Sequence, residues 1–382
     1  MADLIIVVDP GRSLSKIFYS YRGQKPKLLL MEPEVIEMDV NILSEEYENK
    51  VAGAHPEECA WVQAENNAWA VGSFAKDSFR ACKNLKERKS VDSLPKVLAA
   101  LGIIMEREEI PASNLSICLG LLLPKEEWEA RKGFEVRVRE AIAHFRFRHQ
   151  SLSLRLEEFN CSPEGAGLIY ERRRQLGQEF KSLNIGVVIA GYQHCSYLTM
   201  KHGVFGPCDT IDLGFARLVE LVRDSTSGLA IESLTPAICQ AGLKVDCEKL
   251  AYLFDEDDPK RIHELPLLVK AIENAQKRYW AGLRSWLKNS FPHRMMDEIV
   301  LSGGTVGYFK PWFKQLYPSA SYLEQLEKTI KLTFTRSYPF RLSDGNSFFN
   351  YLNDQNNKRA KKLVSLGVSA RGPNSTVVLE SR

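Results

Sequence analysis

The chain has 382 residues, 44% of them hydrophobic and 26% charged, with a formal net charge of +3. This length allows two domains of ordinary size, and the composition is typical of a soluble globular protein. So small a net charge gives no support for direct nucleic-acid binding. No apolar run approaches the ~20 residues of a membrane span, and no basic segment precedes the short first apolar stretch. Neither direct membrane binding nor a signal peptide is therefore expected.

The eight cysteines form no CxxC pair and have no histidine at metal-ligand spacing. Several of them, such as Cys118, lie inside apolar runs. They are therefore expected to be small buried hydrophobic residues in a reducing compartment. The cytoplasm is the expected location.

The first part of the chain has the pattern of strands with a few helices. Strands are predicted over residues 4–9, 15–21, 27–31 and 115–123, a hairpin over 61–72, and helices over 73–79 and 126–140. A longer helix is predicted over 92–106 from its apolar spacing, with Ser93 as N-cap. Residues 145–148 and 152–156 alternate with period two, which predicts an antiparallel pair.

A second strand system follows a helix that is predicted over residues 165–181. Residues 185–191 and 195–201 predict a strand and a returning strand, and residues 203–205 a third strand. Asp212 is predicted to N-cap a helix that runs to about residue 224. Beyond it we predict mainly helix over 230–290 with a loop at 255–259, a strand, glycine turn and helix start over 298–305, and a helix near 320–330.

Two strand-turn-strand segments with a similar layout begin near residues 4 and 185. They are a weak internal duplication, with a hinge expected near residues 163–167. A ligand in a cleft between two such halves is the expected consequence.

The most informative motif is the first turn, where an acid ends an apolar strand and a lysine follows seven residues later. Asp9 is placed to hold Mg²⁺ or its waters, and Lys16 to neutralise phosphate. Gly11 lets backbone N–H groups approach phosphate oxygens, and Ser13 and Ser15 supply hydroxyl groups. The alternatives are a turn aspartate that caps its own backbone and a lysine at a strand edge.

Three further segments stand in a fixed order behind this turn. They are Pro163-Glu164-Gly165-Ala166-Gly167, Ile189-Ala190-Gly191 and Leu301-Ser302-Gly303-Gly304. Taken alone they are weak signals, because an acid is favoured in the first turn of any helix and a Gly-Gly pair is more often a plain turn.

The order of these four segments resembles that of the actin/Hsp70/hexokinase ATPase superfamily, with its first phosphate loop, hinge glutamate, second phosphate loop and adenosine loop. Within it the chain looks most like the bacterial actin-like proteins of the plasmid-segregation type (the ParM/StbA family). Residues 61–75, which end in Val-Gly-Ser-Phe-Ala, are similar to a small-subdomain segment of that family. Residues 212–218 resemble its glycine-led helix after the second phosphate hairpin, and the resemblance covers about residues 4–350.

The resemblance implies an α/β fold of two actin-like (ribonuclease-H-like, duplicated) domains, an ATPase fold with the nucleotide in the cleft between them. Domain I would comprise residues 1–164, with a C-terminal segment, 335–370, packing back on it, and domain II residues 165–334. Residues 371–382 are expected to form a flexible tail.

The resemblance also assigns roles to individual residues. Asp9 would direct the Mg²⁺ ion, and Glu164 would orient or activate the water that attacks the terminal phosphate. The nucleotide, ATP or GTP, would be held by Gly11, Ser13, Ser15, Lys16, Gly191, His194, Gly303 and Gly304.

The second phosphate loop departs from the family pattern Asp-x-Gly-x-x-Thr. When the two are aligned on Gly191, Ile189 stands where the acid belongs and His194 where the threonine belongs. Asp212 comes after the hairpin and is interpreted as the N-cap instead. Removing a transition-state group commonly costs ~10²–10³ in rate, so hydrolysis is expected to be slow or lost. A hydrogen bond from His194 to phosphate would compensate in part.

The implied function is a filament-forming, actin-like nucleotide-binding protein that polymerises with ATP for plasmid or DNA segregation or cytoskeletal positioning. Its partners would be further copies of itself, arranged head to tail, and a DNA-bound adaptor protein. The alternative is a non-hydrolysing actin-like structural scaffold. A small-molecule kinase of the same superfamily ranks below both, because no second clear acid after residue 164 could serve as a substrate base.

Overall fold

The structure is a computed structural model that describes residues 2–50, 54–82, 88–226, 228–254, 261–334 and 339–365. The predicted loop at 255–259 and the predicted tail at 371–382 lie outside the described residues. The chain divides into two compact units, the first comprising Met1–Pro163 with Gly345–Arg382 and the second Glu164–Asp344. The domain boundaries that the sequence suggests remain a prediction.

Unit 1 is built on a nine-stranded sheet with the order β3-β2-β1-β7-β9-β8-β5-β6-β4. Its strands are β1 (Leu4–Asp9), β2 (Ser15–Tyr21), β3 (Lys27–Met31), β4 (Val35–Glu37), β5 (Trp61–Ala64), β6 (Asn67–Val71), β7 (Ser113–Leu123), β8 (Phe145–Phe147) and β9 (Gln150–Pro163). β1 pairs antiparallel with β2, whereas β1, β7 and β9 run parallel. The carboxyl ends of these parallel strands therefore meet at the edge of the sheet where the β1–β2 turn lies.

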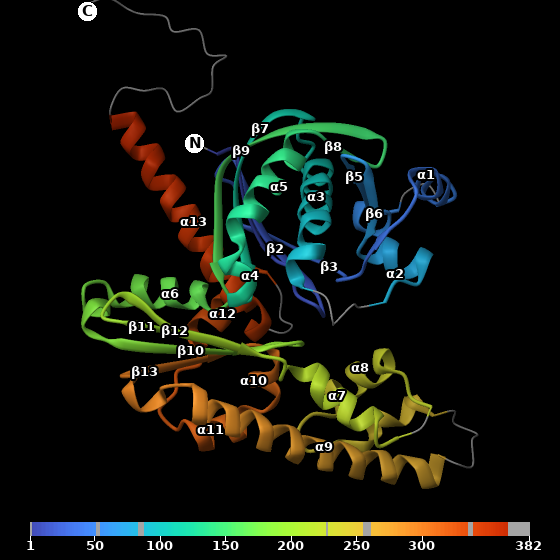
Figure 1. Ribbon diagram of the computed structural model, residues 1–382, viewed down its shortest axis with the longest axis vertical. Coiled ribbons are helices and arrows are strands. Elements are labelled where there is room, and N and C mark those ends of the chain that lie inside the picture. Colours follow the sequence, from blue (N-terminus) through green and yellow to red (C-terminus); the bar gives the residue numbers. More distant parts are fainter. Residues whose placement is uncertain are drawn as a thin grey trace, which may run out of the picture. The chain divides into compact units, whose positions relative to one another are not determined.

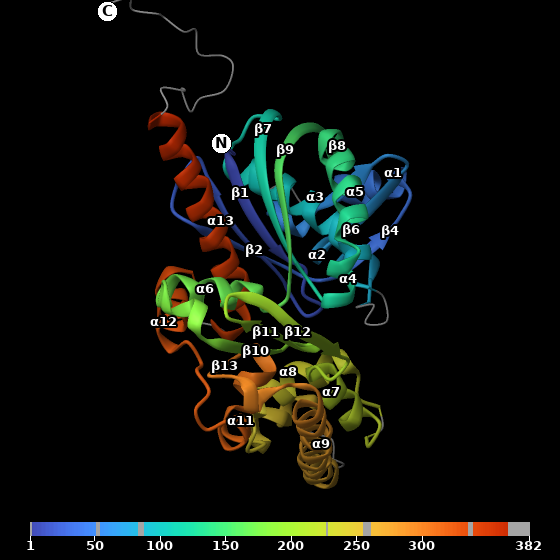
Figure 2. The same ribbon diagram turned by 60° about the vertical axis from the view of Figure 1, so that its left-hand side comes forward.

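Helices cover both faces of the central part of this sheet (Figures 1 and 2). They are α1 (Val40–Glu48), η1 (Pro56–Glu58), α2 (Ser73–Phe79), α3 (Lys89–Arg107), α4 (Lys125–Glu129), α5 (Arg131–Ala143) and, from Gly345 onward, α13 (Pro339–Ser365). Leu4, Ile6 and Val8 alternate along β1 and share one core with α3 and α5. On the opposite face, the ring of Phe349 in α13 lies 6.5 Å from that of Phe18 in β2.

A smaller core lies beside the main one in unit 1. It joins the elements from β4 to α2 around Leu43 of α1, Trp61 of β5 and Phe74 of α2, which are almost fully buried. The predicted hairpin over 61–72 and the predicted helix over 73–79 both belong to it, as β5, β6 and α2.

Unit 2 is built on a four-stranded sheet with the order β12-β11-β10-β13. Its strands are β10 (Asn184–Ala190), β11 (Cys195–Lys201), β12 (Val204–Ile211) and β13 (Glu298–Ser302). Its helices are α6 (Ala166–Leu176), η2 (Glu179–Ser182), α7 (Phe215–Arg223), α8 (Ile231–Ala241), η3 (Cys247–Leu253), α9 (Arg261–Ser290), η4 (His293–Met295), α10 (Gly304–Tyr308), α11 (Lys310–Leu316) and α12 (Glu324–Thr333). β10 is antiparallel to β11 and parallel to β13, which repeats the arrangement of β1, β2 and β7.

The two faces of this second sheet are covered by different helices. Val188 and Tyr197 share a core with α7 and α9. On the other face, Gly165 at the start of α6 lies so near Val187 and Leu198 that an added Cβ would be 3.4 Å from one and 3.6 Å from the other. Its φ of +96° also favours glycine, which fixes how the chain enters α6.

Three local predictions need correction. Ser93 is no N-cap, because α3 begins at Lys89 and the carboxylate of Glu127 accepts the N–H groups of Lys89 and Ser90 at 2.9 and 2.6 Å. The helix predicted over 165–181 ends at Leu176, since Gly177 follows with a φ of +57°. The strand predicted over 203–205 continues to Ile211 as β12, because it pairs along β11.

The cysteines fit the prediction only in part. Cys59, Cys118 and Cys195 are buried, and burial raises the pKa of the Cys118 thiol to about 12. Three others, Cys82, Cys239 and Cys247, are exposed. None of the eight forms a disulfide in the described residues.

Candidate functional site

The first turn brings an acid and a base together across the β1–β2 hairpin. Asp9 ends β1 and is the direct cross-strand partner of Lys16 in β2. The Nζ atom of Lys16 lies 2.5 Å from Oδ2 of Asp9, and each side chain is 13% exposed. Both side chains are therefore largely buried, and the ion pair holds them in a defined position at the carboxyl edge of the sheet.

Gly11 is required by the close approach of the backbone in this turn. A Cβ at this position would lie 2.4 Å from the carbonyl oxygen of Leu14 and 3.3 Å from Nζ of Lys16. The N–H of Gly11 also donates to the carbonyl oxygen of Asp9 at 2.8 Å. Because Gly11 has no side chain, the Lys16 ammonium lies close to the backbone of the turn. A phosphate group could therefore contact the ammonium and backbone N–H groups together.

The two serines of the turn differ in their placement. Ser13 is partly exposed, but Ser15 is fully buried. Because side chains alternate along a strand, Ser15 shares the core-facing side of β2 with Ile17, whereas Lys16 points to the other side. Ser15 is therefore poorly placed for the predicted contact with a nucleotide.

Arg12 anchors the turn to α3, a contact that the sequence did not reveal. Its side chain is 2% exposed and forms an ion pair with Asp92. Beside this pair lies Lys96, which is fully buried and whose Nζ has no hydrogen-bond partner in the described part of the chain. Burial lowers the pKa of Lys96 to about 8, against the opposing effect of Asp92.

The second turn connects β10 and β11 and consists of residues 191–194. The N–H of Gly191 donates to the carbonyl oxygen of His194 at 2.8 Å. A Cβ at Gly191 would meet only that oxygen, at 3.4 Å, so this turn tolerates a small side chain better than the first.

Asp212 is placed differently from the prediction. The N-cap of α7 is Gly214, which provides no side-chain cap, so Asp212 does not cap this helix. Instead, Oδ1 of Asp212 lies 3.0 Å from Nε2 of His194, with the Asp212 side chain 86% exposed and that of His194 13% exposed. The segment 203–205 was predicted too short, and the full length of β12 carries Asp212 back to the second turn. A carboxylate thus lies at this turn, although Ile189 occupies the position where the resemblance stated above expects an acid.

Gly214 joins the second turn to α7. Its N–H and those of the next two residues donate to the carbonyl oxygens of Gln193, Gly191 and Tyr192, at 2.9, 3.1 and 2.8 Å. A Cβ on Gly214 would lie 2.2 Å from the carbonyl oxygen of Tyr192. The glycine that leads this helix is therefore needed for the turn and the helix to pack.

Gly303 and Gly304 lie next to the second turn, because β10 and β13 run parallel and end at the same edge. Gly303 has a φ of +101°, and a Cβ on it would lie 2.3 Å from the carbonyl oxygen of Ala190. The hydroxyl of Thr305 donates to the carbonyl oxygen of Gly191 at 2.7 Å. Unit 2 thus gathers Gly191, His194, Gly303 and Gly304 at one edge of its sheet.

Glu164 follows the last residue of β9 and is held by a serine that the sequence analysis missed. The hydroxyl of Ser196 donates to Oε2 of Glu164 at 3.2 Å and lies 3.0 Å from Oγ1 of Thr210. Ser196 is the cross-strand partner of Ile189, seven residues earlier, as Lys16 is of Asp9. That equal spacing is the signal that could have identified it.

The donor set of the first turn fits Mg²⁺ with a nucleotide, because Mg²⁺ keeps several waters and takes few carboxylates from the protein. Among the described residues there is no group of three or more His, Cys, Asp or Glu side chains that could enclose a metal ion by themselves. No helix in the described ranges has the length and apolar character that crossing a membrane requires.

No family model and no curated protein matches the chain. Among solved structures, a 15-stranded ParM filament from Clostridium botulinum is 17% identical, with 93% of this chain and 100% of that chain covered and a TM-score of 0.61. ParM from Bacillus thuringiensis, solved with ATP, is 11% identical over 93% and 100% of the two chains, with a TM-score of 0.55. An AlfA filament from a B. subtilis plasmid is 15% identical over 90% and 97%, with a TM-score of 0.51.

Coverage is nearly complete on both sides in these comparisons, so the likeness extends over both units. The α/β actin-like fold class expected from the order of four short motifs is therefore confirmed. The chain has the two-unit actin-like fold that the ParM and AlfA structures share.

Proposed function

We propose that this protein is a filament-forming, actin-like nucleotide-binding protein whose assembly depends on ATP and Mg²⁺. The fold supports the proposal, since the ParM of C. botulinum and the AlfA of B. subtilis were solved as filaments and the ParM of B. thuringiensis with ATP. Plasmid or DNA segregation through a DNA-bound adaptor is the proposed role, in the cytoplasm. ATP is preferred over GTP on the same comparison.

The observation that carries the proposal is the Asp9–Lys16 pair on a turn that Gly11 keeps open. Lys16 is placed to leave Asp9 and neutralise a phosphate group, and Asp9 is then available to the waters of Mg²⁺. Bound Mg²⁺ would supply charge neutralisation for the phosphates. Ser13 and the backbone of Gly11 complete this part of the proposed site.

Unit 2 supplies the remaining proposed residues. Gly303 and Gly304 keep the backbone free of side chains where the adenosine would pass, and His194 lies in the second turn with Asp212 as its partner. Glu164, held by Ser196, would orient the water that attacks the terminal phosphate. These assignments extend the roles that the resemblance implies.

We further propose that Asp212 partly replaces the missing acid of the second phosphate loop. Its carboxylate is exposed and lies at the turn, but it is borne by a different segment from the family's acid. Hydrolysis that is slower than in a protein with the usual acid is the expected result.

A non-hydrolysing scaffold is the second candidate, and Ile189 at the family's acid position is the observation that favours it. A scaffold would have the same fold and would assemble like the first candidate, but it would release no phosphate.

The two candidates are separated by one experiment on the purified chain. ATP with Mg²⁺ is added, assembly is followed by light scattering and electron microscopy, and released phosphate is measured in the same samples. Filaments with slow phosphate release support the first candidate, and filaments without release support the scaffold. If no filaments form at any protein concentration, with or without nucleotide, the proposed function is wrong.

A further inference from the structure

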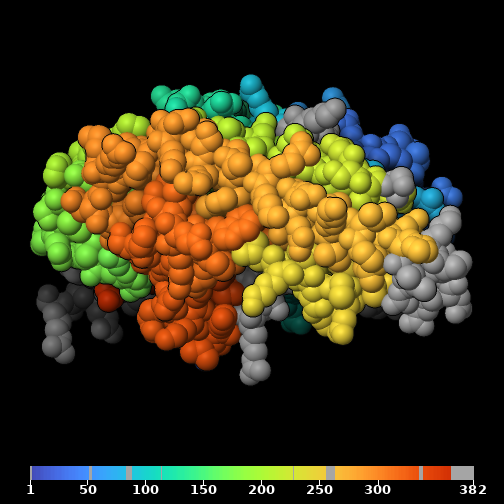
Figure 3. Space-filling model, turned by 90° about the horizontal axis from the view of Figure 1, so that it is seen from below, coloured from blue at the N-terminus to red at the C-terminus, as the bar shows by residue number. Residues whose placement is uncertain are grey.

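The exposed face of α9 carries a row of positive charges. Lys270, Lys277, Arg284 and Lys288 are all exposed, and we call them the cationic row. Their spacing of 7, 7 and 4 residues keeps them within an arc of about 40° along about 27 Å of helix, at 100° and 1.5 Å per residue. Figure 3 looks onto the side of the molecule that carries α9.

This concentration of charge is not a property of the whole chain. Residues 270–294 contain six basic residues and one acidic residue, Glu273, although the net charge of the entire protein is only +3. No residue of the cationic row forms an ion pair within the described ranges of the chain.

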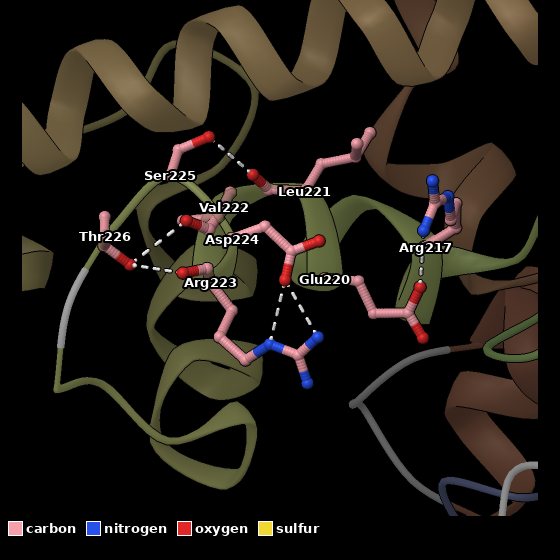
Figure 4. A network of polar contacts seen from close by, with 8 residues as sticks. All are labelled: Arg217, Glu220, Leu221, Val222, Arg223, Asp224, Ser225 and Thr226. Carbon is pink, nitrogen blue, oxygen red and sulfur yellow. Dashed lines mark hydrogen bonds and ion pairs between the residues drawn. The ribbon is translucent and has the colours of Figure 1, made fainter.

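The neighbouring helix α7 has a different arrangement, which Figure 4 shows. There Arg217 pairs with Glu220 and Arg223 with Asp224, each at 2.9 Å, so local acids neutralise the arginines. Glu273 is the one acid between Lys270 and Lys288, so the four basic side chains of the cationic row keep a net positive charge that is available to something outside this helix.

The opposite charge is gathered in unit 1. Residues 32–65 contain ten acidic residues and a single basic one, Lys50. These acids belong to the segment that runs from the end of β3 to the β5–β6 turn, and α1 and β5 in this segment contribute Leu43 and Trp61 to the small core. The acids of this segment that are exposed form what we call the acidic surface: Glu37, Asp39, Glu45, Glu48, Glu58 and Glu65.

Both surfaces also expose an apolar side chain. Ile42 of α1 is 46% exposed beside Glu45, and Leu267 of α9 is 65% exposed one turn before Lys270. A partner that covered these surfaces would remove apolar area from water as well as pair charges.

We propose that the cationic row of one copy docks on the acidic surface of a second copy of this chain. The inference rests on the proposed filament function and assigns one of its contacts. It is carried by charge complementarity, because a single chain holds two exposed surfaces of opposite sign on two different units. A nucleic acid would account for the cationic row alone, whereas a second copy accounts for both surfaces.

Such a contact is heterologous, since it joins two different surfaces of identical chains. Heterologous contacts that do not close into a ring generate open helical filaments. Contacts between opposite charges also speed association and weaken with salt. The critical concentration for assembly is therefore expected to rise with ionic strength.

Two charge-reversal variants test the contact. One is Lys277→Glu with Arg284→Glu in α9, and the other is Glu45→Lys with Glu48→Lys in α1. The second pair lies near the end of its helix, where lysine is favourable, so α1 should still form. Each variant alone is expected to raise the critical concentration with ATP and Mg²⁺ by about tenfold or more, because attraction becomes repulsion.

Mixing the two variants is the decisive step. In an equimolar mixture the reversed row of one variant meets the reversed acidic surface of the other, and the two original surfaces also meet. Alternating copies should therefore assemble near the wild-type critical concentration, a recovery that a misfolded variant could not produce. Lys328→Glu with Lys331→Glu, two exposed lysines of α12, is the matched control and should assemble as wild type.

The outcomes separate this inference from the proposed function. If wild type does not assemble, the proposed function fails and the contact with it. If wild type assembles and either charge-reversal variant keeps its critical concentration, the contact is wrong and the proposed function stands. The contact is also wrong if the mixture does not recover the wild-type critical concentration, or if the control variant assembles as poorly as the charge-reversal variants. It is wrong as well if the cationic row is needed only to retain duplex DNA and not for assembly.

Discussion

The β1–β2 hairpin of unit 1 and the β10–β11 hairpin of unit 2 share antiparallel strand pairing but differ in chemistry. In each, two residues seven apart are cross-strand partners near the turn. In unit 1 these are Asp9 and Lys16, which pair as ions. In unit 2 they are Ile189 and Ser196, and the serine donates to Glu164.

The comparison shows that a repeated fold does not repeat its functional groups. The first hairpin holds an acid and a base of its own. The second supports Glu164 through Ser196, and the carboxylate at its turn, Asp212, is brought by the end of β12. The proposed tasks are therefore divided: the first turn holds the metal and phosphate, and the second hairpin positions Glu164 through Ser196 and adds the exposed acid Asp212.

The largest predicted effect concerns Lys96, the buried base beside the first turn. We describe no such base beside the second turn. The pKa of Lys96 is lowered by burial from its ordinary 10.5 to about 8. Between these pH values the unfolded chain binds more protons than the folded chain, so the stability of the fold should rise with pH through this window. Below it, the folded protein bears the full cost of burying the charged Lys96. Arg12, Asp92, Lys89 and Glu34 are the charged groups around it.

Lys96→Met should therefore stabilise the protein at pH 7 by up to about 3 kcal/mol and flatten the rise between pH 8 and 10.5. Urea unfolding at several pH values measures both effects. A variant that is less stable than wild type at pH 7 would mean that Lys96 has a stabilising partner in the folded protein.

Asp9→Asn tests whether the first hairpin holds the metal. The substitution removes the carboxylate charge that is proposed to interact with the waters of Mg²⁺. ATP affinity in the presence of Mg²⁺ should therefore fall by about a hundredfold, as expected for loss of a charged interaction. Titration calorimetry measures it. Asp212→Asn is the matched change at the second turn and should cost much less, because that side chain is 86% exposed. Equal losses would remove the proposed division of tasks.

Gly11→Ala and Gly191→Ala compare the tightness of the two turns. The added methyl would lie 2.4 Å from a backbone oxygen in the first turn and 3.4 Å in the second. We expect a loss of about 2 kcal/mol for Gly11→Ala and within about 0.5 kcal/mol for Gly191→Ala. Chemical unfolding reports both, and a reversed order would contradict the geometry of the turns.

Ser196→Ala should give the smallest effect. Glu164 loses one hydrogen bond, worth about 1 kcal/mol, so phosphate release should slow about fivefold while ATP affinity is kept. The two quantities are measured on the same preparation. A loss of affinity with unchanged release would place Ser196 in nucleotide binding instead.

Much of the fold was accessible from local patterns. The strands expected at 4–9 and 15–21 are β1 and β2, because a β-branched run and a turn define them without help from distant residues. Ser93 could not be assigned, since the group that caps α3 is Glu127, which arrives from another helix. The end of α6 was missed although Gly177 marks it, because the apolar spacing continues beyond it.

In the candidate site, too, local spacing predicted some residues, whereas others depend on contacts between distant segments. Asp9, Gly11 and Lys16 lie on one hairpin, so their spacing alone brought them together. Asp212 was assigned to the wrong role, because its contact with His194 depends on the full length of β12. Arg12 was missed because its partner lies 80 residues away in α3.

A structure of the chain with Mg²⁺ and a non-hydrolysable ATP analogue would show directly whether Lys16 and Asp9 serve the nucleotide. The quantity to measure is the distance from Nζ of Lys16 to the nearest phosphate oxygen. We predict about 2.8 Å, the length of a charge-assisted hydrogen bond, with Asp9 released toward the waters of the metal. A nucleotide bound away from this turn, with Lys16 still on Asp9, would contradict the account.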